Sequence, residues 1–249
     1  MSQHAPTSGH APMSSQTSMA AASAANSAAT GAVTSALLPG FDNPVDDAQQ
    51  VFRAALDAFA HPGMLQALPA ASVGRPAGLS PAMTALLLTL ADSDTPVWLP
   101  ADIGGEARAF LRFHCGCPLV DNAAQATFVC VPMGDTLPSL AQCAQGDPAY
   151  PDRSATLLVE LAALSNDAAT GSDKGGDKGS DKGGDNASDA YTLRGPGIET
   201  TQTLLASGLP NDFRAQWRAN NAGFPLGVDL LLTAGDRFCA LPRTTHLED

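Results

Sequence analysis

The chain has 249 residues, with 13 basic and 25 acidic side chains and a formal net charge of −12. A nucleic-acid-binding protein needs a basic face that releases counterions from the phosphates, so the acidic balance argues against that class. The longest apolar run lies around residues 85–90. It is far shorter than the roughly 20 residues of a membrane-spanning helix, which argues against an integral membrane protein.

Two stretches have a biased composition. Residues 1–35 are rich in Ala and Ser and contain no Asp, Glu, Lys or Arg, which predicts a disordered tail. Residues from about 166 to 190 repeat Asp-Lys-Gly, which predicts a disordered, solvated insert between two strands. We therefore expect one domain over residues 36–249 that carries this insert. The tail has no basic and apolar regions typical of a secretory signal, so the five cysteines indicate a reduced, cytoplasmic protein.

All lysines of the chain lie in the predicted insert, at Lys174, Lys178 and Lys182. A P-loop needs a lysine held against the β- and γ-phosphates, and a pyridoxal-phosphate enzyme needs a lysine amine for its Schiff base. A lysine on a flexible Gly/Asp segment cannot be held in either way. The distribution therefore excludes mechanisms that depend on a lysine in a packed site.

The first predicted helix begins at Asp42 or Asn43, followed by Pro44, because a capping side chain precedes a residue favoured in the first turn. It ends at His61, where Pro and Gly follow. Its apolar face is predicted, from helical spacing, to consist of Val45, Ala48, Phe52, Ala55, Leu56 and Phe59.

The later segments predict alternating strands and helices. Helices are expected from Ser80-Pro81 to about residue 90, at 104–113, and at 211–221 with Phe213 and Trp217 on one side; the first of these is apolar nearly all round and should be buried. Strands are expected at 96–99, 127–131 and 155–161, and a hairpin at 228–233 and 237–241. This order predicts the α/β class, as a single domain with a mixed sheet flanked by helices.

The segment 112–118 carries the densest group of reactive side chains. His114, Cys115 and Cys117 lie within four residues and are soft metal ligands. A tetrahedral site needs a fourth ligand, and the other candidates in the chain are Cys130, Cys143, Cys239 and His246. The alternative is a turn with small buried thiols. We expect no metal here and keep Arg112 and His114 as candidate binding or interface residues.

Further candidate binding or interface residues come from the last third of the chain. Gly195 and Gly197 follow a predicted strand, where a glycine turn either brings backbone N–H groups to an anion or is simply tight. Asn221 lies where a helix joins the strand that begins near Asp229, whose carboxylate either borders a pocket or pairs with an arginine. Arg243 would hold a phosphate or carboxylate, or make an interface ion pair.

The sequence contains no complete catalytic set. A nucleophile elbow, an HExxH motif and a plausible Ser/His/Asp arrangement are all missing. The histidines outside the tail, His61, His114 and His246, are widely separated and do not form an acid–base group. We therefore predict no catalytic residue in this chain.

The order of six short segments resembles the PhnH family of the bacterial carbon–phosphorus lyase system. They are FDNPVDDAQQVFRAALDAFAHPG, LLLTLADSDTPVWLP, LRFHCGCP, GPGI, FPLGVDLLL and ALPRTT, and they run from about Leu38 to Thr245 around the insert. Two departures stand out. Leu226 occupies a position where the family commonly has a basic residue, and the family does not require Cys115 or Cys117.

The resemblance implies a fold similar to that of pyridoxal-phosphate-dependent transferases, without the cofactor. It also implies a cytoplasmic bacterial assembly with PhnG, PhnI and PhnJ subunits, which displaces adenine from ATP with a phosphonate. With methylphosphonate the product is alpha-D-ribose 1-methylphosphonate 5-triphosphate. A later radical step, assigned to the iron–sulfur subunit PhnJ, cleaves the C–P bond. ATP and Mg are then expected to act in the complex, and no cofactor is expected in this subunit.

These observations favour an accessory subunit of the phosphonate-processing enzyme that acts through protein contacts, with a homodimer as a further possibility for the isolated chain. The first alternative is an independent domain that binds a small anion, such as a phosphonate or a nucleotide, with the GPGI turn, Asp229 and Arg243 lining the pocket. The second alternative is a metal or redox protein that uses His114, Cys115 and Cys117.

Overall fold

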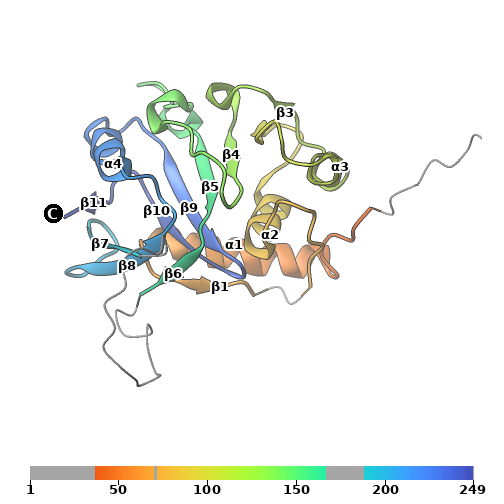
Figure 1. Cartoon of the computed structure of the whole chain (residues 1–249), viewed down its shortest axis with the longest axis horizontal. Helices are drawn as coiled ribbons and strands as arrows, with labels where there is room; N and C mark the ends of the chain where they lie inside the picture. Colours follow the sequence, from red (N-terminus) through yellow and green to blue (C-terminus); the bar gives the residue numbers. More distant parts are fainter. Residues whose placement is uncertain (1–36, 70–71, 167–187, 249) are drawn as a thin grey trace, which may run out of the picture. The chain divides into compact units, whose positions relative to one another are not determined.

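The computed structural model describes residues 37–69, 72–166 and 188–248. These residues form four α helices: α1 Pro44–Ala60, α2 Pro81–Leu90, α3 Gly105–His114 and α4 Phe213–Ala222 (Figure 1). A seven-stranded sheet contains, in spatial order, β1 Gln66–Ala67, β10 Arg237–Leu241, β9 Asp229–Ala234, β5 Thr156–Glu160, β4 Phe128–Val131, β2 Val97–Trp98 and β3 Leu119–Val120. A four-stranded sheet contains β11 His246–Leu247, β7 Asp189–Arg194, β8 Gln202–Ser207 and β6 Ala163–Ser165.

The larger sheet is mixed. Strands β3, β2, β4, β5 and β9 pair with one another in parallel, whereas β10 runs antiparallel to β9 and β1 runs antiparallel to β10. The predicted hairpin at 228–241 is confirmed as β9 and β10, and it makes one end of the sheet antiparallel. The α/β class with a mixed sheet is therefore confirmed, whereas the likeness to pyridoxal-phosphate-dependent transferases stays a prediction.

Each face of the larger sheet packs into its own apolar cluster because successive strand residues point to opposite faces. Leu158 and Leu231 belong to the cluster that contains the buried faces of α1, α2 and α3. Their neighbours Leu157 and Leu230 belong to the cluster that contains α4 and the smaller sheet. Figure 1 shows this division, with α2 and α3 to the right of the central strands and α4, β7 and β11 to the left.

The ends of α1 and α2 lie where the sequence predicts them. Asn43 caps α1, and its side chain accepts a hydrogen bond from the N–H of Asp46. Ser80 caps α2 in the same way, and its hydroxyl accepts from the N–H of Met83 at 3.1 Å. The interior of α2, residues 82–87, is completely buried, which confirms the expectation from its all-round apolar sequence.

The predicted apolar face of α1 is wrong in part. The buried residues of this helix are Val51, Ala55 and Ala58, and the helix packs with α2 and β10. Val45, Phe52 and Leu56 belong to the predicted apolar face but are exposed. The apolar surface of α1 is wider than one contact surface covers, so spacing alone does not reveal which part of it is buried.

The smaller, antiparallel sheet was not predicted as a separate unit. Its strands β6 and β7 flank the predicted insert and both pair with β8. Residues 167–187 of the insert and the predicted tail at 1–35 lie outside the described residues. Both ends of the stretch 166–190 belong to the fold: Asn166 donates to the Gly63 carbonyl at 2.7 Å, and Asp189 begins β7.

Within residues 37–69, 72–166 and 188–248, no helix is both long enough and apolar enough to cross a membrane.

Candidate functional site

The structure brings Asp229 and Arg243 together at the start of β9 and just after β10. The Asp229 carboxylate accepts from the guanidinium twice, through Nε at 3.1 Å and through Nη2. It also accepts from the backbone N–H of Arg243 at 2.7 Å. Such a two-pronged pair fixes geometry as well as charge. Pairing with an arginine was one of the two roles expected for Asp229.

The remaining N–H groups of Arg243 hold two loops. Nη1 donates to the carbonyl of Pro151 at 3.1 Å and to that of Pro225 at 3.3 Å, and Nη2 also donates to the hydroxyl of Ser154. A guanidinium has five N–H donors, and all five are used here. In this arrangement Arg243 has no donor left for a phosphate or a carboxylate ligand, so an anion would have to displace an internal partner.

Both partners of this pair are largely withdrawn from solvent, with side-chain exposures of 12% for Arg243 and 20% for Asp229. Desolvating two charges costs energy, which their attraction offsets only when the remaining polar atoms are also hydrogen-bonded. The contacts with Pro151, Ser154 and Pro225 meet that condition. We call Asp229, Arg243, Ser154 and the carbonyls of Pro151 and Pro225 the Arg243 junction.

Helix α4 fixes the chain that follows Arg243. The side-chain amide of Asn221 donates to the Arg243 carbonyl at 2.8 Å and to the Thr245 carbonyl at 3.4 Å. The indole of Trp217 donates to the same Thr245 carbonyl at 2.8 Å. Asn221 therefore lies beside the junction, and its amide N–H groups serve the backbone.

The GPGI turn lies between the end of α1 and the chain after Arg243. Gly197 has φ of 81°, and a Cβ atom there would approach the Ala60 carbonyl oxygen to 2.0 Å. Gly195 has φ of 148°, and a Cβ atom there would lie 3.0 Å from the Thr244 oxygen. Both positions require glycine for the close approach of another backbone. The turn is closed by a hydrogen bond from Ile198 N–H to the Gly195 carbonyl at 3.1 Å.

Arg112 and His114 lie on α3, in the other apolar layer from the junction. Arg112 is exposed. The Nε2 atom of His114 lies 2.9 Å from the Leu38 carbonyl oxygen, and its ring centroid lies 4.4 Å from that of Phe110. His114 thus holds the segment before α1 against α3. The structure does not bring these two candidates together with the other five.

The thiols after α3 interact with each other. The Cys115 thiol donates to the Leu87 carbonyl at 3.6 Å. Its hydrogen-bonding interaction with Cys117, together with burial, raises the pKa of Cys115 well above its usual value. The same interaction lowers the pKa of Cys117. Of the predicted fourth ligands, only Cys130 shares their apolar cluster, while Cys143 and Cys239 belong to the opposite one. In the described part of the chain, all five cysteines are free and no three ligand-type residues form a metal-binding group.

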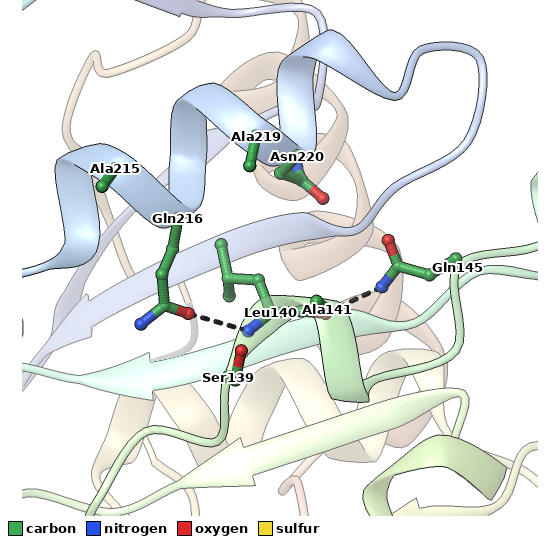
Figure 2. A pocket seen from close by; sticks show the side chains of 8 residues that line it. All are labelled: Ser139, Leu140, Ala141, Gln145, Ala215, Gln216, Ala219 and Asn220. Carbon is green, nitrogen blue, oxygen red and sulfur yellow. Dashed lines mark hydrogen bonds between the residues drawn. The ribbon is translucent and has the colours of Figure 1, made fainter.

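A pocket of about 380 Å³ lies between α4 and the short 3₁₀ helix Leu140–Gln142 (Figure 2). Figure 2 shows its lining residues: Ser139, Leu140, Ala141, Gln145, Ala215, Gln216, Ala219 and Asn220. The Gln216 side chain accepts from Leu140 N–H at 2.9 Å, and Gln145 donates to the Leu140 carbonyl at 2.7 Å. The lining contains small apolar side chains and engaged amides but no charged residue, so it offers nothing that would attract an anion.

Sequence reasoning did not find Ser154, Gln145 or Gln216. Ser154 and Gln216 form side-chain hydrogen bonds with distant segments of the chain, Gln145 bonds within its own loop, and none of the three lies in a recognisable motif.

Comparison with known proteins links this fold to phosphonate metabolism. The model of a family described as bacterial phosphonate metabolism protein (PhnH) matches residues 39–248. A relative from Rhizobium meliloti (strain 1021), the alpha-D-ribose 1-methylphosphonate 5-triphosphate synthase subunit PhnH, is 40% identical over 209 residues, which cover 84% of this chain and 94% of the relative. A putative C-P lyase subunit protein HtxG from Stutzerimonas stutzeri is 49% identical over 55 residues, which cover 22% of this chain and 28% of that protein.

The family match spans nearly all of the described residues, and it includes the Arg243 junction, α1 and the thiol segment after α3. The resemblance noted from the six ordered motifs is thereby confirmed. The chain belongs to the PhnH family of phosphonate-metabolism proteins.

Proposed function

We propose that this protein is an accessory subunit of the phosphonate C–P lyase core complex and acts through protein contacts. In that role it supports the formation of alpha-D-ribose 1-methylphosphonate 5-triphosphate from ATP and methylphosphonate. The observation that carries the proposal is the near full-length similarity to a protein named as a subunit of the synthase for that product.

The geometry of the candidate polar residues supports a structural role for this chain. Arg243, the best candidate for holding a phosphate, uses its five donors on internal partners. Asn221 likewise donates to backbone carbonyls. A site that binds or transforms a substrate needs convergent free polar groups. These residues instead stabilise the loops that surround β9 and β10.

Other parts of the proposal concern the assembly. PhnG, PhnI and PhnJ are the proposed partners, ATP and Mg are used by the complex, and the iron–sulfur cluster resides on PhnJ. The proposed location is the bacterial cytoplasm, and a homodimer is the alternative state of the isolated chain. No cofactor is assigned to this chain.

Affinity purification tests this proposal. The tagged protein is expressed in its native bacterium and purified from phosphate-starved cells. PhnG, PhnI and PhnJ should co-purify with it in a fixed ratio. Recovery of the tagged protein alone would refute a role as a complex subunit. Calorimetric titration of the purified chain with ATP and methylphosphonate serves as the second arm, because saturable micromolar binding abolished by Arg243→Ala would favour an independent anion-binding domain.

A further inference from the structure

Helix α1 carries a row of large apolar side chains on the surface of the molecule. Val45, Phe52 and Leu56 are 66%, 46% and 53% exposed. They are separated by seven and four residues, so they lie along one side of the helix. A lone exposed apolar residue is ordinary, whereas several large apolar side chains on one side of a helix, here interrupted by the exposed Gln49, are typical of an interaction site. We call these three residues the outer row of α1.

The outer row is distinct from the part of α1 that joins the core. Val51, Ala55 and Ala58 are the buried residues of the helix, and α2 and β10 are its packing neighbours. The outer row lies beside this buried strip on the helix surface, and its side chains extend toward solvent. Folding of the described chain thus covers only part of the apolar surface that the helix presents.

Charged side chains border the outer row. Asp46, Arg53 and Asp57 are exposed on the side of the helix away from the buried strip. Asp57 already accepts from Gln66 at 2.6 Å and lies 3.1 Å from His61 Nδ1. Arg53 has no hydrogen bond or ion pair within the described residues, so its guanidinium remains available for a carboxylate of another molecule.

We infer that the outer row of α1 is the surface through which this chain docks onto another subunit of its synthase. This inference rests on the proposed function. The partner surface is an apolar strip with a carboxylate opposite Arg53 and basic side chains opposite the acidic start of the helix. Aromatic and arginine side chains supply much of the binding energy in such interfaces, which makes Phe52 and Arg53 the central residues of this surface.

The charges on α1 favour a different subunit over a second copy of this chain. The carboxylates of Asp42, Asp46 and Asp57 are exposed, and Asp47 adds a further negative charge. The only basic side chain on α1 is Arg53, so this end of the molecule carries an excess of negative charge. Two copies brought together through α1 would juxtapose these carboxylates, and like charges across an interface are strongly unfavourable. A partner with a basic rim removes that conflict.

Co-expression with the PhnG, PhnI and PhnJ subunits tests the inference. Phe52→Asp/Leu56→Asp should reduce recovery of the partners at least tenfold, whereas Phe113→Asp/Met133→Asp, at positions that are 67% and 66% exposed outside α1, should leave it unchanged. All four positions are solvent-exposed, so the melting temperatures should match that of the wild type. Arg53→Glu, which removes no apolar contact, should weaken recovery several-fold.

The outcomes separate the two proposals. If the wild-type chain recovers no partner, the proposed function fails. If the wild type recovers them and the α1 variant does so equally well, or if the control variant loses them too, the assignment to α1 is overturned. Light scattering adds a final arm: a wild-type dimer that becomes a monomer only in the Phe52→Asp/Leu56→Asp variant would make a second copy the occupant and overturn the choice of a different subunit.

Discussion

The Arg243 junction and the outer row of α1 differ in how the fold treats them. The polar groups of the junction are hydrogen-bonded within the molecule, whereas the apolar side chains of the outer row remain exposed. At the junction, a charged side chain has all its donors satisfied internally. On α1, side chains that would be expected in a core lie in solvent. A conspicuous polar residue is therefore the poorer guide to the interaction surface of this molecule. The hydrophobic residues that the fold fails to cover are the better guide.

The largest effect is expected from opening the junction. Asp229→Asn or Arg243→Met should lower the free energy of unfolding by about 3–5 kcal/mol, because each leaves a largely buried charge without its partner. The double variant Asp229→Leu/Arg243→Met should cost less than the sum of the single losses, since it buries no unpaired charge. Urea unfolding measures all three. Additive losses, or single variants as stable as the wild type, would contradict the closed junction.

A smaller loss of stability should distinguish the buried side of α1 from its exposed side, at the adjacent positions 51 and 52. Val51→Ala should cost about 2 kcal/mol, because Val51 is fully buried and its loss leaves a small cavity. Phe52→Ala should cost clearly less than Val51→Ala although it removes a larger side chain, because Phe52 is already 46% exposed. Thermal and urea unfolding of this matched pair compare the two faces directly. Equal costs would place Phe52 in the core after all.

The bond from α4 to the chain after the junction has a more modest expected contribution. Trp217→Phe removes the indole donor to the Thr245 carbonyl, which should cost about 1 kcal/mol, and adds the cost of the space that the fully buried indole vacates. The loss is limited because Asn221 still donates to the same carbonyl. The Asn221→Ala variant in the Trp217→Phe background should then cost more than Asn221→Ala alone. Simple additivity in the unfolding free energies would argue against a shared acceptor.

Substitution of a thiol after α3 is expected to have the smallest effect on stability, but it should change the reactivity of the neighbouring thiol. The pKa of Cys115 is raised chiefly by its hydrogen-bonding interaction with Cys117, and burial adds to this, so its thiolate forms only at high pH. Cys117→Ala removes that interaction and should lower the pKa of Cys115. At a pH below the pKa, lowering the pKa by one increases the thiolate fraction, and hence the alkylation rate, about tenfold. Iodoacetamide labelling at several pH values with mass spectrometry measures this rate, and an unchanged pH profile would contradict the bond.

Much of the fold could be predicted from the sequence because local signals mark it. The capping residues Asn43 and Ser80 define helix starts, and the apolar runs at 128–131 and 156–160 fill the interior of the larger sheet. The smaller sheet escaped prediction because its strands are half-exposed. In β7, for example, only Tyr191 and Leu193 are buried. Such strands depend on tertiary pairing more than on composition.

The candidate site could be predicted only as a set of separate residues. Asp229 and Arg243 were both identified, but their pairing depends on the antiparallel register of β9 and β10, which places the ends of the hairpin side by side. The part played by Ser154 depends on a loop from a different region of the chain. The burial of α1 likewise depends on where α2 and β10 contact it. None of these contacts leaves a periodic pattern in the sequence.

The position of β9 has a consequence for how the protein is made. This strand lies between β5 and β10 in the larger sheet, and α1 packs on β10, although a ribosome produces α1 long before residues 229–241. Until that hairpin emerges, the nascent chain exposes the edge of β5 and the part of α1 that later packs on β10, and such unpaired edges invite aggregation. A premature stop before residue 229 therefore removes one of the two packing partners of the earliest helix. The polypeptide becomes a substrate for chaperones and proteases.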